Sequence, residues 1–410
     1  MRLSTSQIYD KGLSSVIDRQ QKLVKVQDQI AKETTILTPA DDPAGKAQAL
    51  ALTDRIKQNE QFQKNSQLVL NDLSRQESVM SNISESLFRA KELFVQAGNG
   101  ALDATDRQSL ALEIEVLRDN ALDMMNARNE NGDYLFAGYQ TETQPFVFNP
   151  TTGVYDYAGD NGAKKVQLTS SLQVKSSTSG AEAFQQTPTQ LKARVEQSSG
   201  DITGGRSLIT DPGTWNEYHA NSFDKKNSDN NLYTVSVDGD TYSITKPDPD
   251  GGAPIEQASG TFVPGEPIEY QGMQLNVLGN ATDGTLSFRL SQPKQNVATV
   301  LNDMVVALNN PALSTAELTQ AIEFGLADLD AAEVNLGSAR AKTGSRMNSA
   351  ETAILTNMDF EIANKETRSR IQDVDYAKAM TELTKQDTAL QAAQATFTRI
   401  TRLSLFDYLR

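Results

Sequence analysis

The sequence predicts a mainly α-helical protein with a β-rich insert: long N- and C-terminal helices paired in a coiled-coil or helical-bundle rod, plus a small antiparallel β domain in the middle. Of the 13 prolines, two lie at positions 39 and 43, and the other 11 all lie between Pro145 and Pro311. Because proline interrupts helices, this distribution favours helical ends and a non-helical middle. Apolar residues recur at spacings of three and four in both ends, whereas they alternate with polar residues in the middle.

The first segment, from about Thr5 to Leu37, has the pattern of one strand of a coiled coil. Its apolar residues fall on one heptad seam, and polar residues occupy alternate seam positions, where they weaken a coiled coil but set its register. The apolar residues are Leu13, Val16, Leu23, Ile30 and Leu37, and the polar ones are Gln20, Gln27 and Thr34.

The stretch TPADDPAG, at positions 38–45, separates this segment from the next. The Thr38-Pro39 step favours extended backbone and ends the preceding helix. Asp42 suits an N-cap position, because its carboxylate accepts from the free N–H groups of a first helical turn. Pro43 then falls at the first helical position, where its missing N–H costs nothing. We therefore expect a hinge and helix cap at Asp41, Asp42 and Pro43.

The second segment, from Pro43 to about Ala97, continues the apolar repeat over about six heptads, with polar interruptions that include Ser66 and Gln76. The sequence GNG at 98–100 ends it. Thr105 and Gln108 have capping-box spacing, which predicts a third helix that folds back on the second.

From Tyr134 the apolar period changes to two. YLFAGYQ and FVF are typical of strands, and Gly159–Gly162 of a hairpin turn. The Asp238-Gly239 pair between alternating residues is the strongest short-range hairpin signal in the chain. IEYQGMQLNVLG and TLSFRLS predict more strands, and the Ser- and Gly-rich stretches 176–180 and 198–205 predict linkers.

Helices return near Asn296, and Ser314 and Glu317 give a second capping-box signal. Gly325, Gly337 and Gly344 lie in the apolar stripe that follows, and each costs about 1 kcal/mol relative to Ala. The sequence leaves open whether close helix approach offsets that cost. After a break around 367–373, the last segment carries a seam with spacings of four and three. Its residues are Ala379, Leu383, Gln386, Leu390, Ala393, Phe397 and Ile400.

The two ends therefore mirror each other, each with an outer segment, a break and a longer inner helix. This predicts a terminal coiled-coil assembly domain (1–42 and 370–410), a helical rod domain with β-hairpins (43–180 and 294–369) and a β-rich outer domain (185–292). The outer pair has few large apolar residues, so we expect it to fold fully only against other subunits. The predicted assembly interface comprises Leu13, Val16, Leu23, Ile30, Leu37, Ala379, Leu383, Leu390, Ala393, Phe397 and Ile400.

Composition argues against several functions. The 53 Asp and Glu residues against 38 Lys and Arg give a net charge of −15, which disfavours nucleic-acid and anionic-membrane partners. There is no cysteine, and the single histidine, His219, which we expect at the surface, leaves no His-rich metal site. No segment approaches the ~20 apolar residues of a membrane span, and the N-terminus lacks the apolar region of a cleaved signal peptide.

No catalytic, cofactor-binding or metal-binding residue is expected, so the prediction is a non-enzymatic protein. The H-E-x-x-H helix of metalloproteases needs two histidines. PDPDGG at 247–252 lacks the spacing and the terminal Glu of a calcium-binding EF-hand loop, and we interpret it as a turn.

Five fragments, in this order, resemble the flagellin superfamily and, within it, the branch of hook–filament junction proteins. They are LTPADDPAGKAQALAL, NGDYLFAGYQT, YAGDNGAKKVQL, SRIQDVDYAKAMTELTK and QAAQATFTRITRLSLFDYLR. The resemblance covers about 1–180 and 295–410. Flagellins share a similar joint but typically have Ala at the Pro43 position, and they lack YLFAG.

The resemblance implies an extracellular structural subunit of the bacterial flagellum that joins the hook, through hook-associated protein 1, to the flagellin filament. It also implies other copies of the chain as partners, export through the flagellar type III apparatus, and a cytosolic export chaperone for the C-terminal helix. Two alternatives stay open. One is flagellin itself, and the other is a surface adhesin carried by 185–292, with Trp215, Tyr218 and Phe223 as exposed contacts.

Overall fold

A computed structural model describes residues 5–150 and 152–408, without the side chains of residues 5, 6, 8, 280, 281, 400 and 402–408. The chain divides into two compact units. Unit 1 comprises Met1–Gln67, Gln167–Leu172 and Glu351–Arg410, and unit 2 comprises Leu68–Val166 and Gln173–Ala350. Long terminal helices and a middle antiparallel sheet confirm the predicted fold class. The three-domain division remains a prediction.

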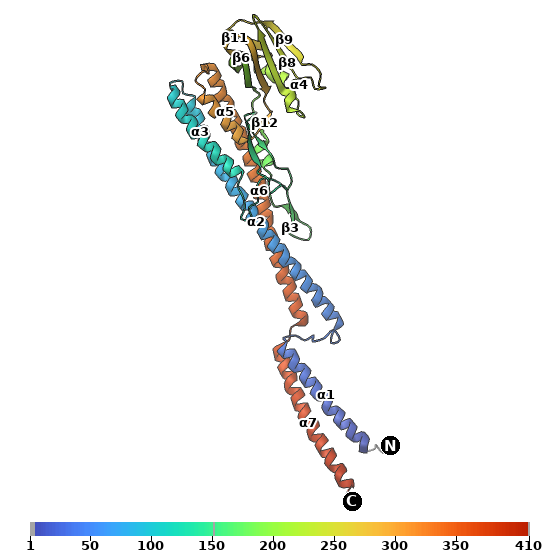
Figure 1. Cartoon of the computed structure of the whole chain (residues 1–410). Helices are drawn as coiled ribbons and strands as arrows, with labels where there is room; N and C mark the ends of the chain where they lie inside the picture. Colours follow the sequence, from blue (N-terminus) through green and yellow to red (C-terminus); the bar gives the residue numbers. More distant parts are fainter. Residues whose placement is uncertain (1–4, 151, 409–410) are drawn as a thin grey trace. The chain divides into compact units, whose positions relative to one another are not determined.

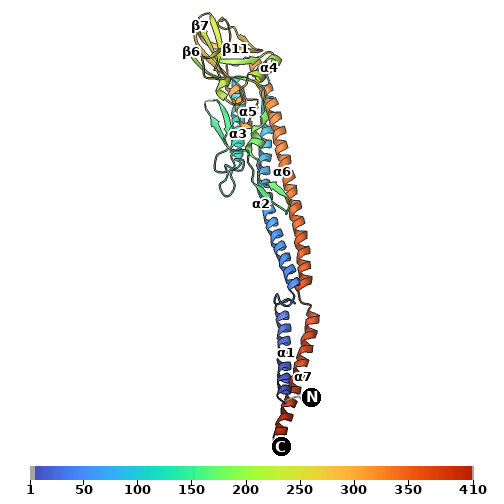
Figure 2. The ribbon, with the colours of Figure 1, turned by 90° about the vertical axis from the view of Figure 1, so that its right-hand side faces the viewer.

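Unit 1 is built from antiparallel helices. Helix α1 (Thr5–Ala31) lies beside α7 (Tyr376–Tyr408), as Figures 1 and 2 both show. The first part of α2 (Pro43–Ala97) lies beside the last part of α6 (Thr315–Gln372). Gln63 Nε2 donates to Glu361 Oε2 at 2.7 Å, and Arg368 Nη1 to Thr53 Oγ1 at 3.4 Å, which fixes the antiparallel direction of this second pair.

The helical part of unit 2 contains the rest of α2 and α6 together with α3 (Ala104–Met125) and α5 (Val297–Asn309). The predicted capping box at Ser314 and Glu317 is confirmed, since each residue accepts from the backbone N–H of the other. The box predicted at Thr105 and Gln108 is wrong: α3 begins at Ala104, and Asp103 and Asp106 form the box instead. The core residues include Met80, Ile83, Leu87, Phe94, Ile114, Leu301 and Leu329.

Short strands and turns join these helices. β1 (Phe146–Asn149) pairs with β2 (Val154–Tyr157), and β3 (Lys165–Gln167) with β4 (Gln173–Lys175). A π-helical turn, η1 (Ala181–Gln185), leads into β5 (Thr187–Pro188), which pairs with β12 (Lys294–Gln295).

Three expectations for this region are wrong. YLFAGYQ forms turns rather than a strand. Gly159–Gly162 connects β2 to β3, which do not pair with each other, so it is not a hairpin turn. In both stretches Asp160 shapes the loop, because it accepts from the backbone N–H groups of Tyr139 and Gly162. Residues 176–180 are no linker either. Thr178 is buried, and its N–H donates to the buried Gln76 Oε1 at 2.8 Å.

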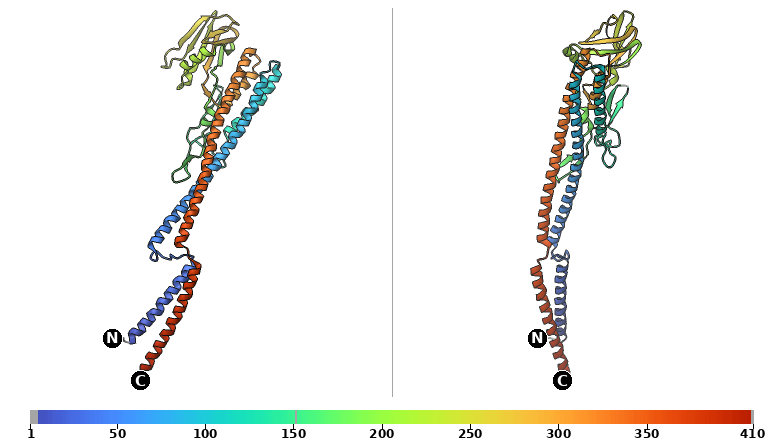
Figure 3. Two further views of the ribbon diagram at one scale, coloured as in Figure 1. Left: turned by 180° about the vertical axis from the view of Figure 1, so that it is seen from behind. Right: turned by 90° about the vertical axis from the view of Figure 1, so that its left-hand side faces the viewer.

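The middle of the chain forms a six-stranded antiparallel sheet with the order β10-β11-β7-β8-β9, and β6 also pairs with β11. The Asp238-Gly239 turn joins β7 to β8 as predicted, with Gly239 at a φ of 56°. Residues 198–205 lie inside β6 rather than in a linker, because they pair along β11. The strands are β6 (Ala193–Ile209), β7 (Leu232–Asp238), β8 (Thr241–Lys246), β9 (Ile255–Thr261), β10 (Ile268–Tyr270) and β11 (Met273–Leu290). Figure 3 shows this sheet from two further sides.

Helix α4 (Pro212–Ser222) packs on this sheet, followed by the 3-10 turn η2 (Ser228–Asn231). Trp215 and His219 of α4 are buried, so the expectations of a surface histidine and of an exposed tryptophan are wrong. Trp215 Nε1 donates to Leu191 O at 2.9 Å, and His219 Nε2 lies 2.8 Å from Ser291 O. Burial lowers the pKa of His219. Tyr218 and Phe223 pack against the same core.

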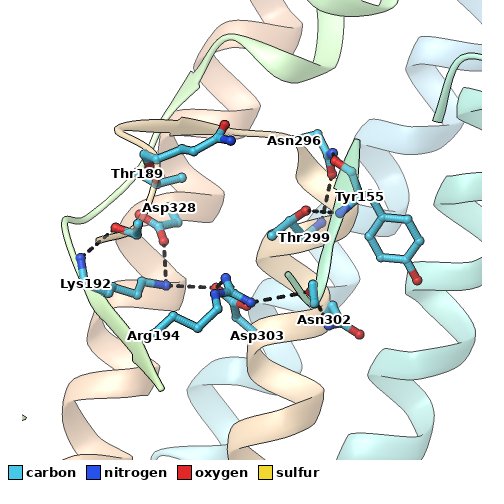
Figure 4. A network of polar contacts seen from close by, with 12 residues as sticks. Tyr155, Thr189, Lys192, Arg194, Asn296, Thr299, Asn302, Asp303 and Asp328 are labelled. Atoms are coloured by element: carbon cyan, nitrogen blue, oxygen red, sulfur yellow. Dashed lines mark hydrogen bonds and ion pairs between the residues drawn. The ribbon is translucent and has the colours of Figure 1, made fainter. Parts of the chain in front are cut away.

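A polar network holds the start of β6 against α5 and α6 within unit 2 (Figure 4). Lys192 Nζ lies 3.3 Å from Asp303 Oδ2 and 3.2 Å from Asp328 Oδ2, and Arg194 Nη2 lies 2.7 Å from Asp303 Oδ1. Asp328 is buried, and its Oδ1 accepts from the N–H of Gln190 at 2.6 Å. Burial raises the pKa of Asp328, while the adjacent Lys192 lowers it.

The three glycines of α6 have different surroundings. A Cβ atom on Gly325 would lie 2.6 Å from Met304 Cε and 2.8 Å from Phe94 Cε2, whereas nothing lies within 4 Å of one on Gly337 or Gly344. Close helix packing therefore accounts for Gly325 alone.

We expect Gly325→Val to destabilise unit 2 by about 1–3 kcal/mol through overpacking against the Phe94 ring. We expect Gly337→Ala and Gly344→Ala to stabilise it by up to about 1 kcal/mol each, because alanine favours helix. Chemical denaturation monitored by circular dichroism measures all three changes. Equal effects at the three positions would contradict this assignment.

Candidate assembly surface and helix joint

The residues predicted as an interface mostly lie on the faces that α1 and α7 turn towards each other. Val16, Leu23 and Ile30 of α1 are partly buried. On α7, Ala379 is buried, and Leu383, Leu390, Ala393 and Phe397 are partly buried. Because α7 is the element that packs on α1, this seam is formed within one chain. The side chain of Ile400 lies outside the described residues, and Leu37 lies in the loop after α1.

The seam is tightest near Gly12. The Phe397 ring covers this glycine so closely that a Cβ atom there would lie 2.9 Å from Phe397 Cδ2. Tyr9 meets the same ring, with 5.1 Å between ring centroids. The absence of a side chain at position 12 therefore lets the two helices approach each other.

A second apolar stripe on α1 is largely exposed within the described residues, although Tyr9 at one end of it also meets the Phe397 ring. Tyr9, Leu13, Ile17 and Val24 are 40 to 48% exposed. At 3.6 residues per turn they fall within about 80° of the helix circumference, beside the seam. We call these four residues the α1 stripe. Contiguous exposed apolar side chains of this kind mark protein–protein contact surfaces.

The predicted seam missed most of the α1 stripe. A single heptad pattern was assigned to this segment, and Leu13 is the only residue of the stripe that belongs to that pattern. The signal was present in the sequence: Tyr9, Leu13 and Ile17 have the spacing of four that places residues on one helix face. The buried residues Val26 and Ile36 were also missed.

Helix α1 ends at Ala31, six positions before the predicted end at Leu37. Glu33 adopts a left-handed conformation with a φ of 54°. Around it, the N–H of Glu33 donates to Ile30 O and the N–H of Thr34 to Gln29 O. These two bonds form a Schellman motif, which closes the helix with a glutamate where glycine is usual.

The two breaks in the helices are hydrogen-bonded to each other. The N–H of Thr35 donates to Gln372 O at 2.7 Å, and the N–H of Val374 donates to Glu33 O at 3.2 Å. The hydroxyl groups of Thr34 and Thr35 also donate to Gln372 O. Residues 33–35 and 372–374 therefore form a short antiparallel tie at the base of the α1–α7 pair. The sequence pattern did not predict this tie between the two breaks.

The acidic pair of the joint has two separate roles. Asp42 lies directly before α2, and its Oδ1 accepts from the N–H of Gly45 at 2.9 Å, so that α2 begins at Pro43. Asp41 instead closes the loop. Its Oδ2 accepts from the N–H of Thr38 at 2.8 Å, and its Oδ1 lies 2.5 Å from Lys25 Nζ. Asp41 thus ties the loop back to α1.

The hydrogen bond from Lys25, together with that from the Thr38 N–H, lowers the pKa of Asp41 from 3.8 to about 2. A lowered pKa in the folded state means that this contact stabilises the joint above pH 3.8 and is lost as the pH falls towards about 2. We expect the Asp41 carboxyl carbon to titrate near pH 2 by NMR, and at a higher pH in Lys25→Met, where the hydrogen bonds from Thr38 still hold the pKa below its ordinary value. An Asp41 midpoint near 3.8 in the unmodified chain would contradict the closed loop.

No described residues form a cluster of three or more potential metal ligands. Within 5–150 and 152–408, no helix combines the length and apolar character needed to cross a membrane. The arrangement offers a paired helix surface with exposed apolar side chains and a hydrogen-bonded joint.

Two families match the ends of the chain. The bacterial flagellin N-terminal helical region matches residues 3–141, and the bacterial flagellin C-terminal helical region matches residues 319–409. These matches include α1, the joint, α2 and α7. The middle of the chain lies outside both.

Flagellar hook-associated protein 3 of Escherichia coli strain K12 is 30% identical over 253 residues, which cover 58% of this chain and 78% of that protein. The protein of the same name from Salmonella typhimurium is 33% identical over 184 residues, which cover 45% of this chain and 57% of that protein. The match thus spans little more than half the length of the Salmonella relative.

The crystal structure of the flagellar junction protein from Legionella pneumophila has a TM-score of 0.50 and 25% identity, covering 80% of this chain and 100% of that chain. Flagellins are matched more distantly, either over a smaller part of the chain or at lower identity. The chain therefore belongs to the flagellin superfamily and, within it, to the family of flagellar hook-associated protein 3, structural components of the bacterial flagellum.

Proposed function

We propose that the chain is a structural subunit of the hook–filament junction, which joins the hook-associated protein 1 zone to the flagellin filament through its terminal helices. The observation that carries this proposal is the α1 stripe, an exposed apolar surface on the terminal helix pair of this chain. The similarity to a flagellar junction protein supports it. An acidic, highly charged chain would not keep four large apolar side chains on one face of a helix without a partner for them.

The predicted interface residues enter this proposal in two roles. Val16, Leu23, Ile30 and their counterparts on α7 hold the pair together, and the α1 stripe docks on a neighbouring subunit. Such a contact joins two different surfaces, so it is heterologous and extends along an axis rather than closing into a dimer. A junction subunit needs this geometry, because it meets a different protein at each end.

The proposed partners are hook-associated protein 1, flagellin and other copies of the chain. We also propose that the chain leaves the cell through the flagellar type III apparatus, that a cytosolic chaperone holds its C-terminal helix beforehand, and that its final location is extracellular. No enzymatic activity is proposed. Folding of the outer helices on assembly stays a prediction, and uniformly slow amide exchange over residues 5–40 of the isolated chain would contradict it.

Deletion of the gene from the source bacterium tests the junction role. We expect deleted cells to carry hooks without filaments and to release flagellin into the medium, and the returned gene to restore filaments. A control strain receives the gene with residues 5–31 removed, which should not restore them. Normal filaments on the deleted cells would contradict the proposal.

The flagellin alternative has a direct test. Electron microscopy of the purified chain in ammonium sulfate, which strengthens burial of apolar surface, should show monomers or short aggregates for a junction subunit. Long regular filaments would instead identify a self-propagating subunit.

A further inference from the structure

Unit 2 contains a cavity of about 860 Å³ that the junction role does not use. Its walls come from the β1–β2 hairpin, the end of η1, the starts of β6 and α5, the loop after α4 and the segment between β11 and β12. Its size lies within the range of about 300–1,000 Å³ that small-molecule sites occupy.

One side of the cavity shares residues with the polar network of Figure 4. Tyr155 N–H donates to Thr299 Oγ1 at 3.0 Å, and Asn296 Nδ2 donates to Tyr155 O. Arg194, which also lines the cavity, is held by Asp303. Hydrogen bonds and an ion pair within the chain therefore hold this side of the cavity in place.

Two glutamines on the cavity wall lack hydrogen-bond partners. Gln295 is 5% exposed, lines the cavity, and has no partner for its side-chain amide among the described residues. Gln185 Oε1 is buried there and accepts from no described donor, and Thr152 Oγ1 is in the same state. A buried polar group without a partner costs free energy, so Gln185 Oε1 and Thr152 Oγ1 call for a ligand or ordered water.

The same wall carries three lysines that form no ion pair with a described carboxylate. They are Lys225, Lys226 and Lys294. Lys294 Nζ donates only to the amide oxygen of Gln186 at 3.0 Å. In a chain of net charge −15, three unpaired lysines around one cavity favour an anionic ligand.

The carboxylates of the cavity already have donors. Glu196 Oε1 lies 2.6 Å from Arg289 Nε, and Asp156 Oδ2 accepts from Asn149 Nδ2 at 2.8 Å. Asp224 Oδ1 accepts from the N–H of Lys226 at 2.7 Å. Only Glu196 is neutralised by a cation, and Asp156 and Asp224 keep their charge, but the five basic side chains that line the cavity outnumber its three carboxylates.

The unpartnered atoms narrow the chemistry of the ligand. Gln185 Oε1 accepts hydrogen bonds only, so its partner must carry a donor, which an inorganic anion or a simple ionised carboxylate lacks. A hydroxyl group both donates and accepts, so it satisfies Gln185 Oε1 and the Gln295 amide alike. We propose that this cavity binds an acidic saccharide, whose hydroxyl groups pair with Gln185 and Gln295 and whose carboxylate lies near Lys225, Lys226 and Lys294.

Calorimetric titration of the full-length chain at low salt tests this proposal. The probes are D-glucuronic acid, D-galacturonic acid and N-acetylneuraminic acid, with D-glucose and sodium acetate as comparators. We expect an acidic saccharide to bind at least about tenfold more tightly than either comparator, because both its charge and its hydroxyl groups find partners. This result does not depend on the junction role.

Two variants locate the site. Gln295→Leu should weaken binding by about tenfold through loss of one hydrogen-bonding group, without lowering the midpoint of unfolding, because it breaks no side-chain hydrogen bond between described residues. Lys225→Gln with Lys226→Gln changes exposed side chains and should remove the preference over D-glucose. The matched control is Gln197→Leu, an exposed glutamine of β6 outside the cavity, which should bind normally.

Equal affinity for acetate, D-glucose and the acidic saccharides would overturn the proposal. Unchanged binding in both cavity variants would also overturn it. In either case, water alone satisfies the buried amides, and the lysines serve only as surface charge.

Discussion

We expect the replacement of Leu13 and Ile17 with aspartate to leave a folded chain that no longer enters flagella. Both side chains are exposed, at 40 and 46%, so the change removes little burial within the chain and should alter the free energy of unfolding by about 0.5 kcal/mol or less. In a subunit contact the same positions become buried. A buried carboxylate without a partner costs several kcal/mol, and each subunit would carry two of them.

The matched control is Ser14→Asp with Gln21→Asp. It adds the same charge to exposed positions of α1 outside the stripe. We expect control flagella to grow normally, while the Leu13 and Ile17 variant forms hooks without filaments. Equal assembly by the two variants would show that the α1 stripe is not a subunit contact.

Substitutions in the seam would test a different feature. Leu390 and Phe397 are partly buried against α1, so Leu390→Asp with Phe397→Asp should separate α1 from α7 as well as prevent assembly. A failure of that variant would therefore not distinguish pairing within the chain from docking between chains. Substitutions in the α1 stripe distinguish the two, because they affect docking between chains without disturbing the seam within the chain.

Replacing Lys192 with methionine should destabilise the β-rich part of unit 2 by about 3–5 kcal/mol at neutral pH, because it leaves the buried Asp328 carboxylate without its cation. Asp303 keeps its ion pair with Arg194, so the loss of stability arises mainly at Asp328. Trp215, the single tryptophan of the chain, is buried in this part, and its fluorescence reports unfolding in denaturant.

Asp328→Asn in the same chain should recover most of that loss. The substitution removes the charge but keeps an oxygen for the N–H of Gln190. Burial raises the pKa of Asp328, so its protonation in the folded chain begins at a higher pH than that of an ordinary aspartate. The deficit of Lys192→Met should therefore shrink as the pH falls through that raised pKa. A deficit that is independent of pH and unaffected by Asp328→Asn would contradict the role of this pair.

Local signals predicted the ends of most helices. Pro43 after Asp42, the GNG stretch after α2, and the Ser314–Glu317 box all lie where helices begin or end in the structure. Each signal depends only on a few neighbouring residues, so one sequence suffices to recognise it. The end of α1 could not be predicted in this way. Glu33 adopts a left-handed conformation there, and glutamate is not a residue that signals one.

The middle of the chain was less predictable, because its structure depends on distant pairing. Residues 198–205 look like a flexible linker, yet they lie in β6 because β11 pairs with them. His219 and Trp215 lie in a polar stretch and are buried because α4 packs on the sheet. The cavity glutamines give no local signal either, since Gln185 and Gln295 approach through the pairing of β5 with β12.

The central claim, that the α1 stripe is covered by another subunit in the flagellum, has a direct measurement. The chain has no cysteine, so a single one introduced by Ile17→Cys is the sole target of a maleimide dye. We expect Ile17→Cys to label rapidly in the isolated chain and to be protected in assembled flagella, while Ser14→Cys labels equally in both. Equal labelling of Ile17→Cys before and after assembly would contradict the account.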